Sequence, residues 1–341
     1  MRAAEPELPE RVVVLGAGTM GARIALFFAQ AGLPVCAVSR RPQTLRAARA
    51  TVQSALAGPA AAGQAATAPA PAAHDQPDDV LARIRFTTDP GDELGRAGLV
   101  VETIRENLGD KIALLGQIGS RVPADAIVTT NTSSLDLAAL AEAVPGPQRF
   151  AGLHWFNPAD LIELVEIVPT AGTAAGTVAT LRAWLAGLGK APVVLDHAVP
   201  GFVANRLQYA LLREAYALVA AGVCTWADAD LAVVRGLGPR WAAVGPFQSM
   251  DIAGLDVHLA VTRALFPGLA AGTAPPQPLV SLVEAGHLGA KSGRGLLGEY
   301  PPERQELLVR LRDTTLRLMP ALRAAAAGPD PDQVTAERPG P

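Results

Sequence analysis

The sequence has little cysteine, no long apolar run and no excess of charge of one sign. Its two cysteines are far apart and lack metal-ligand spacing, which argues against a disulfide framework or a zinc site and fits a reduced cytoplasm. No stretch reaches the roughly 18 apolar residues of a membrane span, and the acidic start lacks the apolar core of a signal peptide. With a net charge of −3, we expect no binding to nucleic acid or membrane surfaces. We therefore expect a cytoplasmic protein without bound metal.

Composition places the chain among globular proteins with low-complexity patches. Half of its residues are apolar and 18% are charged, and its length allows two domains that each bury a core. Between 57 and 79 the chain is rich in alanine, proline and glycine, which is typical of a flexible excursion. We expect residues 1–10 to form an amino-terminal tail. Residues 327–341 are rich in proline, glycine and aspartate, and we expect them to form a disordered tail.

A glycine turn lies between a predicted strand and a predicted helix near the start. In the run Gly-Ala-Gly-Thr-Met-Gly, Gly16 permits the tight turn and Gly18 lets a pyrophosphate approach the backbone. Gly21 allows close packing of the helix, whose first turn faces the phosphates. The flanking strand, helix and second strand are expected at 11–15, 22–31 and 33–38. This context predicts dinucleotide binding by Gly16, Gly18, Thr19, Met20 and Gly21.

Strands and helices alternate after this unit, which indicates an α/β fold with a doubly wound (Rossmann), mostly parallel sheet. Strands are expected at 83–87, 99–103, 126–130, 149–154, 164–168 and 192–195, and helices at 111–118 and 177–188. After Pro200-Gly201 the pattern becomes helical, at 202–221, 225–235, 255–265, 279–285 and 302–318. We therefore expect a dinucleotide-binding domain over 11–199 and an all-helical domain over 200–326.

Two ionisable side chains stand out downstream of the glycine turn. His154 lies in the run Leu-His-Trp-Phe-Asn-Pro, and Glu166 lies twelve positions later. A lone histidine is more often a core or strand-end residue than a catalytic one. Glu166, however, stands between Val165 and Ile167, where an unpaired buried carboxylate would be costly. A histidine paired with a carboxylate suits proton transfer coupled to hydride transfer.

The chain from about Arg11 to Arg294 resembles the 3-hydroxyacyl-CoA dehydrogenase family. Any one of the matching motifs would say little, whereas the series in its order and spacing is specific. The segments are Gly16–Gly21, Val100–Glu102, Glu106–Leu108, Asn131–Leu135, His154–Pro158, Leu164–Glu166, Pro200–Arg206, Gly245–Phe247 and Gly289–Gly295.

The resemblance implies roles for four side chains at the reacting centre. His154 and Glu166 correspond to the family's catalytic pair, and Ser133 and Asn205 to the residues that position the substrate. Each of the last two also has a structural interpretation. Ser133 or Ser134 could cap the helix that follows, and Asn205 could cap the first helix of the second domain. With all four present, we interpret the chain as an enzyme.

The resemblance also implies a cofactor contact and an assembly. Glu106 and Lys111 correspond to residues near the nicotinamide end of the cofactor. The family usually dimerises through its second domain, whose predicted helices are rich in apolar residues here. We therefore expect a homodimer.

The residues after the second predicted strand favour NADP(H) over NAD(H). NAD-binding relatives usually carry an acidic residue here, whereas this chain reads Ser39-Arg40-Arg41, beginning 18 residues beyond Gly21. A serine and two guanidiniums suit a 2′-phosphate, because arginine binds phosphate in bidentate fashion. The alternative is that Arg40 and Arg41 lie in a solvated turn before Pro42.

The substrate's carrier stays open. Relatives that use CoA thioesters often have basic residues in a helical arm of the first domain, but no lysine or arginine occurs between Arg49 and Arg83. The segments Asn205–Ala210 and Gly236–Gly238, with the charged helix after Tyr300, are similar to the lambda-crystallin and L-gulonate 3-dehydrogenase branch. That branch oxidises free 3-hydroxy acids.

Other segments are more similar to the acyl-CoA branch, notably Leu153–Pro158 and Lys291–Gly295. The main hypothesis is thus an NAD(P)-dependent oxidoreductase acting at C3 of a small-molecule acyl thioester, as in fatty acid metabolism. A free 3-hydroxy acid is the alternative substrate. A non-catalytic binding or structural protein with the same fold is the alternative class, but it would not need Ser133, His154, Glu166 and Asn205 together.

Overall fold

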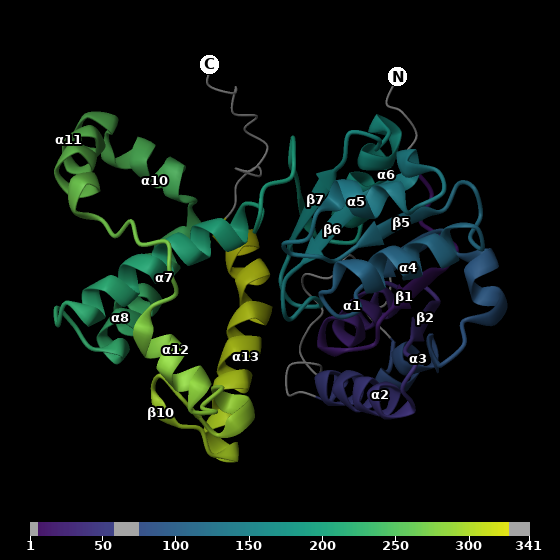
Figure 1. Ribbon diagram of the computed structural model, residues 1–341, viewed down its shortest axis with the longest axis horizontal. Coiled ribbons are helices and arrows are strands. Elements are labelled where there is room, and N and C mark those ends of the chain that lie inside the picture. Colours follow the sequence, from purple (N-terminus) through teal and green to yellow (C-terminus); the bar gives the residue numbers. More distant parts are fainter. Residues whose placement is uncertain (1–5, 58–74, 327–341) are drawn as a thin grey trace. The chain divides into compact units, whose positions relative to one another are not determined.

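The computed structural model describes residues 6–57 and 75–326, which divide into two compact units (Figure 1). The first unit extends to Val203 and the second begins at Ala204. The boundary predicted from the sequence lies four residues earlier, after residue 199. Most of the predicted excursion, at 58–74, lies outside the described residues. The same holds for residues 1–5 of the predicted amino-terminal tail and for the whole predicted tail at 327–341.

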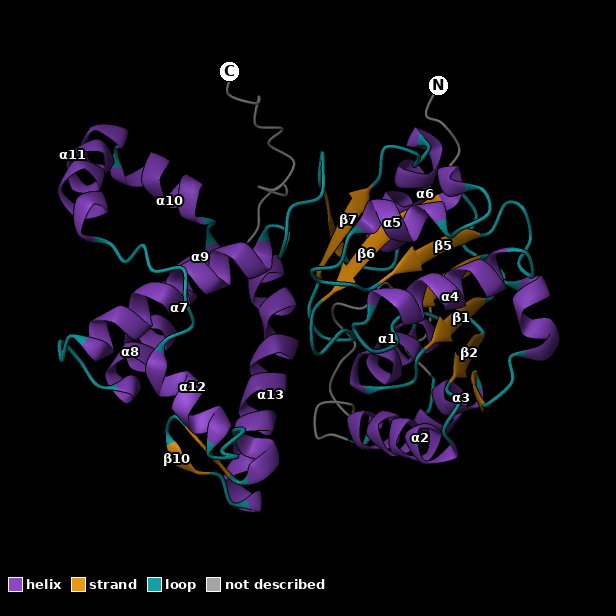
Figure 2. Ribbon diagram, viewed as in Figure 1, coloured by secondary structure: helices purple, strands orange, loops and turns teal. Residues whose placement is uncertain are grey.

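The first unit is built on one mostly parallel sheet of eight described strands (Figure 2). The strand order is β3-β2-β1-β4-β5-β6-β7-β8, and only the β6–β7 pair is antiparallel within this described sheet. This confirms the doubly wound architecture. The strands are β1 (Val12–Leu15), β2 (Val35–Val38), β3 (Ile84–Thr87), β4 (Leu99–Glu102), β5 (Ile127–Thr130), β6 (Phe150–Trp155), β7 (Leu164–Pro169) and β8 (Ala191–Val194).

Helices cover both faces of the sheet. One face carries α1 (Thr19–Gln30), α2 (Pro42–Leu56), α3 (Pro77–Ala82) and α6 (Ala175–Gly187). The other carries η1 (Gly91–Arg96), α4 (Leu108–Gly119) and α5 (Leu137–Glu142), and a short turn, η2 (Pro147–Arg149), precedes β6. Alternate residues of a strand point to opposite faces, so Val12 and Val14 join one apolar cluster while Val13 and Leu15 join the other.

The order of the strands places the functional segments at one edge of the sheet. β1 pairs with β2 on one side and with β4 on the other, so the chain winds away from β1 in both directions. Ligands of such sheets bind outside the carboxyl ends of the strands at this switch point. The glycine turn follows β1, the Ser39–Arg41 segment follows β2, and Glu106 and Ser133 follow β4 and β5. Residues distant in sequence thereby share one edge.

The second unit is helical, as expected, and contains only a two-stranded described ribbon besides its helices. Its elements are α7 (Ala204–Ala220), α8 (Trp226–Ala232), the π-helical turn η3 (Val233–Leu237), α9 (Gly238–Ala243), α10 (Pro246–Ala253), α11 (Leu255–Leu265), η4 (Phe266–Gly268), α12 (Gln277–Glu284), η5 (Ala290–Ser292), β9 (Arg294–Gly295), β10 (Gly298–Glu299) and α13 (Pro302–Ala326). Among the described helices of the chain, none combines the length and apolarity needed to cross a membrane.

Candidate active site

The glycine turn has the shape of a dinucleotide cradle. Gly16 adopts φ +110°, and its amide and that of Ala17 both donate to the Val38 carbonyl, at 2.9 and 3.1 Å. A Cβ on Gly21 would lie 1.8 Å from the Gly16 carbonyl oxygen, so only glycine fits there. A Cβ on Gly18 would meet nothing within 4 Å. The space beside Gly18 is therefore open to a phosphate.

The amino terminus of α1 completes that cradle. Gly18 is the N-cap and supplies no side-chain hydrogen bond, and no acidic side chain lies in the first turn, where Thr19 and Met20 begin the helix. The first amides of a helix without a side-chain cap form a ready anion site. These residues therefore fit the pyrophosphate of a dinucleotide.

The basic segment after β2 lies at the same edge. Arg40 and Arg41 are exposed, and the Arg41 amide donates to Ser39 Oγ at 3.4 Å. A hydrogen bond from Arg105, the charge of Arg105 and then the charge of Arg40 lower the pKa of Asp110, in the first turn of α4. Arg40 is thus within electrostatic range of the segment after β4.

Ser133, His154 and Glu166 form one hydrogen-bonded row. His154 on β6 stands opposite Glu166 on β7 in the antiparallel register, so both side chains emerge on one face of the sheet. His154 Nδ1 lies 2.7 Å from Glu166 Oε2, and His154 Nε2 lies 3.1 Å from Ser133 Oγ. His154 is 3% exposed and Glu166 is 1% exposed. Because an ionised carboxylate only accepts, it holds the proton on Nδ1 and leaves a lone pair on Nε2.

Apolar rings and a backbone amide surround the row. The His154 ring lies 4.5 Å from the Phe156 ring and 5.3 Å from the Phe202 ring. Phe202 has φ +48°, an uncommon conformation for an aromatic residue. The next amide, that of Val203, donates to Glu166 Oε1 at 3.0 Å. The end of the first unit therefore holds the second oxygen of the Glu166 carboxylate.

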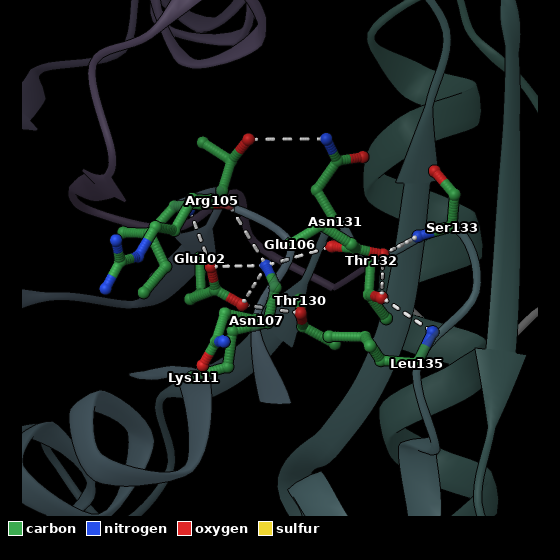
Figure 3. A network of polar contacts seen from close by, with 12 residues as sticks. Glu102, Arg105, Glu106, Asn107, Lys111, Thr130, Asn131, Thr132, Ser133 and Leu135 are labelled. Atoms are coloured by element: carbon green, nitrogen blue, oxygen red, sulfur yellow. Dashed lines mark hydrogen bonds and ion pairs between the residues drawn. The ribbon is translucent and has the colours of Figure 1, made fainter. Parts of the chain in front are cut away.

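A second polar network lies at the ends of β4 and β5, next to the Ser133 row (Figure 3). Lys111 Nζ lies 2.8 and 2.9 Å from the two oxygens of Glu102 and 3.6 Å from Glu106 Oε2. Glu106 Oε1 in turn accepts from the amides of Ser133 and Ser134, at 2.9 and 3.3 Å. Lys111 is 1% exposed, whereas the Glu106 side chain is 40% exposed. The network thus connects a buried ammonium to the Ser133 backbone.

The connection between β6 and β7 is held by two cations. Lys190 Nζ donates to the carbonyls of Ala159 and Ile162, at 2.6 and 2.7 Å, and lies 4.3 Å from the centre of the Phe27 ring. Arg23 of α1 pairs with Asp160 at 2.8 Å. The loop that joins the His154 strand to the Glu166 strand is therefore fixed to the rest of the first unit.

The structure decides between the alternatives for Ser133 and Ser134. The side chain that caps α5 is Asp136, whose carboxylate accepts from the amides of Ala138 and Ala139 at 2.9 and 3.4 Å. The serine-cap interpretation is therefore wrong, and Ser133 points to His154 instead. Asn205 is the second residue of α7, inside the helix and in the second unit, so its substrate contact stays a prediction.

Several residues of the site were not predicted from the sequence. Lys190 and the Val203 amide act through contacts with residues 28 to 37 positions away, which no local pattern reveals. Thr132, which donates its hydroxyl to Glu106, lies inside the Asn-Thr-Ser-Ser motif and could have been found there. Within the described residues, no group of three or more His, Cys, Asp or Glu side chains could hold a metal.

The fold and the site together define a nicotinamide-dependent oxidoreductase. Comparison with known families makes the assignment specific. Residues 11–198 match the 3-hydroxyacyl-CoA dehydrogenase NAD-binding domain, and residues 201–298 match the C-terminal domain of the same family. The chain belongs to the 3-hydroxyacyl-CoA dehydrogenase family.

Individual relatives differ in what they act on. The chain is 35% identical to 5-formyl-3-hydroxy-2-methylpyridine 4-carboxylate 5-dehydrogenase of Mesorhizobium japonicum, over 87% of this chain and 93% of the relative. It is 34% identical to a 3-hydroxybutyryl-CoA dehydrogenase of Mycobacterium tuberculosis, over 84% and 97%. A solved structure of the pyridine-carboxylate enzyme, described as an NAD⁺-dependent dismutase, superposes with a TM-score of 0.82 at 33% identity, covering 93% of this chain and 99% of that one.

Proposed function

We propose that this protein transfers a hydride between a nicotinamide cofactor and C3 of a 3-hydroxyacyl thioester, with His154 as the general acid/base. The observation that carries the proposal is the row Ser133–His154–Glu166, with its distances of 3.1 and 2.7 Å, beside a glycine turn that fits a dinucleotide. Relatives named 3-hydroxybutyryl-CoA dehydrogenase support C3 of an acyl chain as the reacting position.

The roles of the side chains follow from this geometry. When bound, the nicotinamide ring accepts the hydride in the oxidative direction. His154 Nε2 removes the hydroxyl proton, and Glu166 stabilises the imidazolium that forms. Ser133 Oγ donates a hydrogen bond to the reacting oxygen, and Asn205 is the predicted second positioning residue. In the reductive direction the same imidazolium returns the proton.

A second candidate substrate is a small carboxylic acid that is not carried on CoA. The Mesorhizobium japonicum relative is named for a pyridine carboxylate, and a solved structure of an enzyme of that name superposes on this chain with a TM-score of 0.82. The scarcity of basic residues between Arg49 and Arg83 also favours this candidate, because CoA phosphates require cations. The chemistry assigned to His154 is the same for either carrier.

A spectrophotometric screen at 340 nm tests the function and separates the two substrates. Purified protein is assayed with acetoacetyl-CoA, with free 3-hydroxy acids and with the pyridine-carboxylate aldehyde, each with both cofactors. Turnover of acetoacetyl-CoA with reduced cofactor is the expected result. Turnover of only the free acids would replace the thioester with the second candidate. Cofactor binding without turnover of any of them would favour a non-catalytic protein.

We propose in addition that NADP(H) is preferred, because exposed Arg40 and Arg41 follow β2 where an acidic residue would hold a ribose hydroxyl. Replacing both arginines with alanine should raise KM for NADPH about 10- to 100-fold, the worth of a charged hydrogen bond or two, and leave KM for NADH nearly unchanged. Arg46→Ala, on the exposed face of α2, is the matched control. A wild-type KM for NADH equal to or below that for NADPH would refute the preference.

We propose that the working form is a homodimer formed through the second unit. No described side chain of that unit is buried, although the unit carries large apolar residues on nearly every helix. Apolar surface on this scale marks an interaction site in a soluble protein.

A further inference from the structure

Glu106 accepts hydrogen bonds from the segment that carries Ser133. Its Oε1 accepts from the Thr132 hydroxyl and from the Ser133 amide (Figure 3). The Ser134 amide donates to the same oxygen, so three donors from consecutive residues converge on it. Partial burial raises the pKa of Glu106, but the hydrogen bonds from Thr132 and Ser133 and the charge of Lys111 outweigh it, and the pKa lies below its usual value. This lowered pKa favours the carboxylate form of Glu106, which accepts these hydrogen bonds.

Lys111 forms an ion pair with Glu106 from the buried side of the network. Its ammonium is shared between the carboxylate of Glu102, which is fully buried, and that of Glu106. Glu102 is itself held by the Thr130 hydroxyl at 2.6 Å and by the Ile104 amide at 2.7 Å. A buried ammonium with these partners is fixed in place, because moving it would leave charges unpaired in the core. The position of Glu106 Oε2 is thus set by a rigid group.

These contacts determine where the Ser133 hydroxyl lies. The Ser133 amide is bound by Glu106 and the Ser133 Oγ faces His154 Nε2 at 3.1 Å. A shift of the backbone by about 1 Å would break that contact, and such misplacement is enough to cost roughly 100-fold in rate. The geometry of Ser133 therefore depends on Glu106.

We propose that Glu106 and Lys111 are positioning residues that hold Ser133 against His154, with Lys111 acting on Ser133 through Glu106. This inference rests on the proposed role of the Ser133–His154 pair. The 1% exposure of Lys111 supports it, since a ligand at the sheet edge would meet Glu106 first. The resemblance alone had assigned both residues to the nicotinamide end of the cofactor.

The test must separate positioning from cofactor contact, so it uses residues that a ligand cannot reach. Thr132 is fully buried, and Thr132→Val removes its hydroxyl at nearly constant volume, whereas Thr132→Ser retains it. The double variant Glu102→Gln/Lys111→Met removes the buried cation without leaving an unpaired carboxylate in the core, because Glu106 is partly exposed. Glu142→Gln, an exposed charge loss on α5, is the control.

Three quantities are measured: kcat, the cofactor Kd, and hydrogen exchange of the Ser133 and Ser134 amides. We expect Thr132→Val and the double variant to lower kcat about 10- to 100-fold, to leave the cofactor Kd within about twofold, and to speed amide exchange. Thr132→Ser and Glu142→Gln should match the wild type. Unchanged kcat and exchange would overturn the proposal, as would a weaker Kd with unchanged kcat, which would make Lys111 a cofactor ligand.

Failure of this proposal is distinguishable from failure of the proposed function. If the wild type turned over no substrate, amide exchange and the ¹⁵N shifts of the His154 imidazole would still report whether Ser133 keeps its place. Loss of the Nε2 hydrogen bond in Thr132→Val and in the double variant supports the positioning role. Wild-type shifts and exchange in both variants contradict it.

Discussion

The two units of this protein differ in what they bury. In the first unit, apolar clusters fill both faces of the sheet, and side chains as large as Phe28 and Phe150 are almost completely enclosed. In the second unit, none of the described side chains is buried to that degree, and Phe247 and Ile252 are 80% and 78% exposed. Secondary structure is equally regular in both. Regular helices therefore do not by themselves imply a closed core.

This difference explains where buried ionisable groups are found. Glu102, Lys111, His154, Glu166 and Lys190 all lie inside the first unit, each with hydrogen-bond partners from rigid strands or their loops. Burying charges is tolerable only where such partners are fixed, because an unpaired charge costs several kcal/mol. The filled sheet supplies that rigidity. The second unit instead presents apolar surface, which the proposed homodimer would cover.

The largest effect is expected at the buried histidine. His154→Gln retains a hydrogen-bonding side chain of similar reach but cannot carry a proton, so kcat should fall about 10²- to 10⁴-fold, while cofactor affinity changes little. Stopped-flow measurement of hydride transfer together with a cofactor titration checks both halves. A variant that retains near-normal kcat would show that another group is the base.

The next effect concerns the glycine turn and separates packing from binding. Gly21→Ala places a methyl group 1.8 Å from a carbonyl oxygen and should cost about 3 kcal/mol of unfolding free energy, the upper end of the typical range for overpacking. Gly18→Ala meets nothing within 4 Å, so it should preserve stability and weaken cofactor binding alone. Urea unfolding and a cofactor titration compare the two. Equal stability losses would contradict this assignment of the glycines.

Much of the first unit could be predicted from the sequence because its signals are local. The glycine turn and the run around Glu166 each carry their information within a few residues. The hydrogen bond between His154 and Glu166 was less certain, because it depends on β6 and β7 being antiparallel neighbours in the right register. Family resemblance supplied the pairing of the two residues but not the antiparallel register of their strands.

What could not be predicted depends on contacts between distant segments. Helix α2 buries one face through Leu45, Ala48, Val52 and Leu56. Its apolar periodicity is weak in the sequence, because one of these four residues is an alanine and the helix also contains basic residues. Lys111 and Lys190 look like surface residues in sequence. Their burial arises only when Glu102 and the carbonyls of Ala159 and Ile162 are brought to them. Buried cations are thus the residues that local patterns miss.

Lys190 gives a prediction about stability and pH. Burial lowers its pKa from 10.5 to about 8, against the opposing charges of Asp160 and Glu163. Below pH 8 Lys190 is protonated in both the folded and the unfolded chain, and the folded protein bears the full free-energy cost of burying the charged ammonium. Between pH 8 and 10.5 the unfolded chain binds more protons, so this group raises the unfolding free energy as pH rises, by about 3 kcal/mol in all.

Cys36 opposes this trend in part, because burial raises the pKa of its thiol from 9.0 to about 11. The folded chain then holds more protons between those values and loses stability as pH rises. Lys190→Met isolates the lysine, since the cysteine contribution cancels in the difference between variant and wild type. We expect that difference to change by about 3 kcal/mol between pH 8 and 10.5 in urea titrations. Parallel curves would mean that the ammonium is not destabilised by burial.

The smallest effect tests the open surface of the second unit. If a partner copy covers Phe247, replacing it with aspartate removes about 2 kcal/mol of apolar burial per copy and adds a charge to the interface. Light scattering should then show a shift from dimer to monomer at low micromolar concentration, and Tm should depend less steeply on concentration than in the wild type. Val13→Ala, in the closed core of the first unit, should lower Tm and leave its concentration dependence as in the wild type. A Phe247→Asp variant that remains dimeric would place the interface elsewhere on the second unit, and a monomeric wild type would mean that these helices remain uncovered in solution.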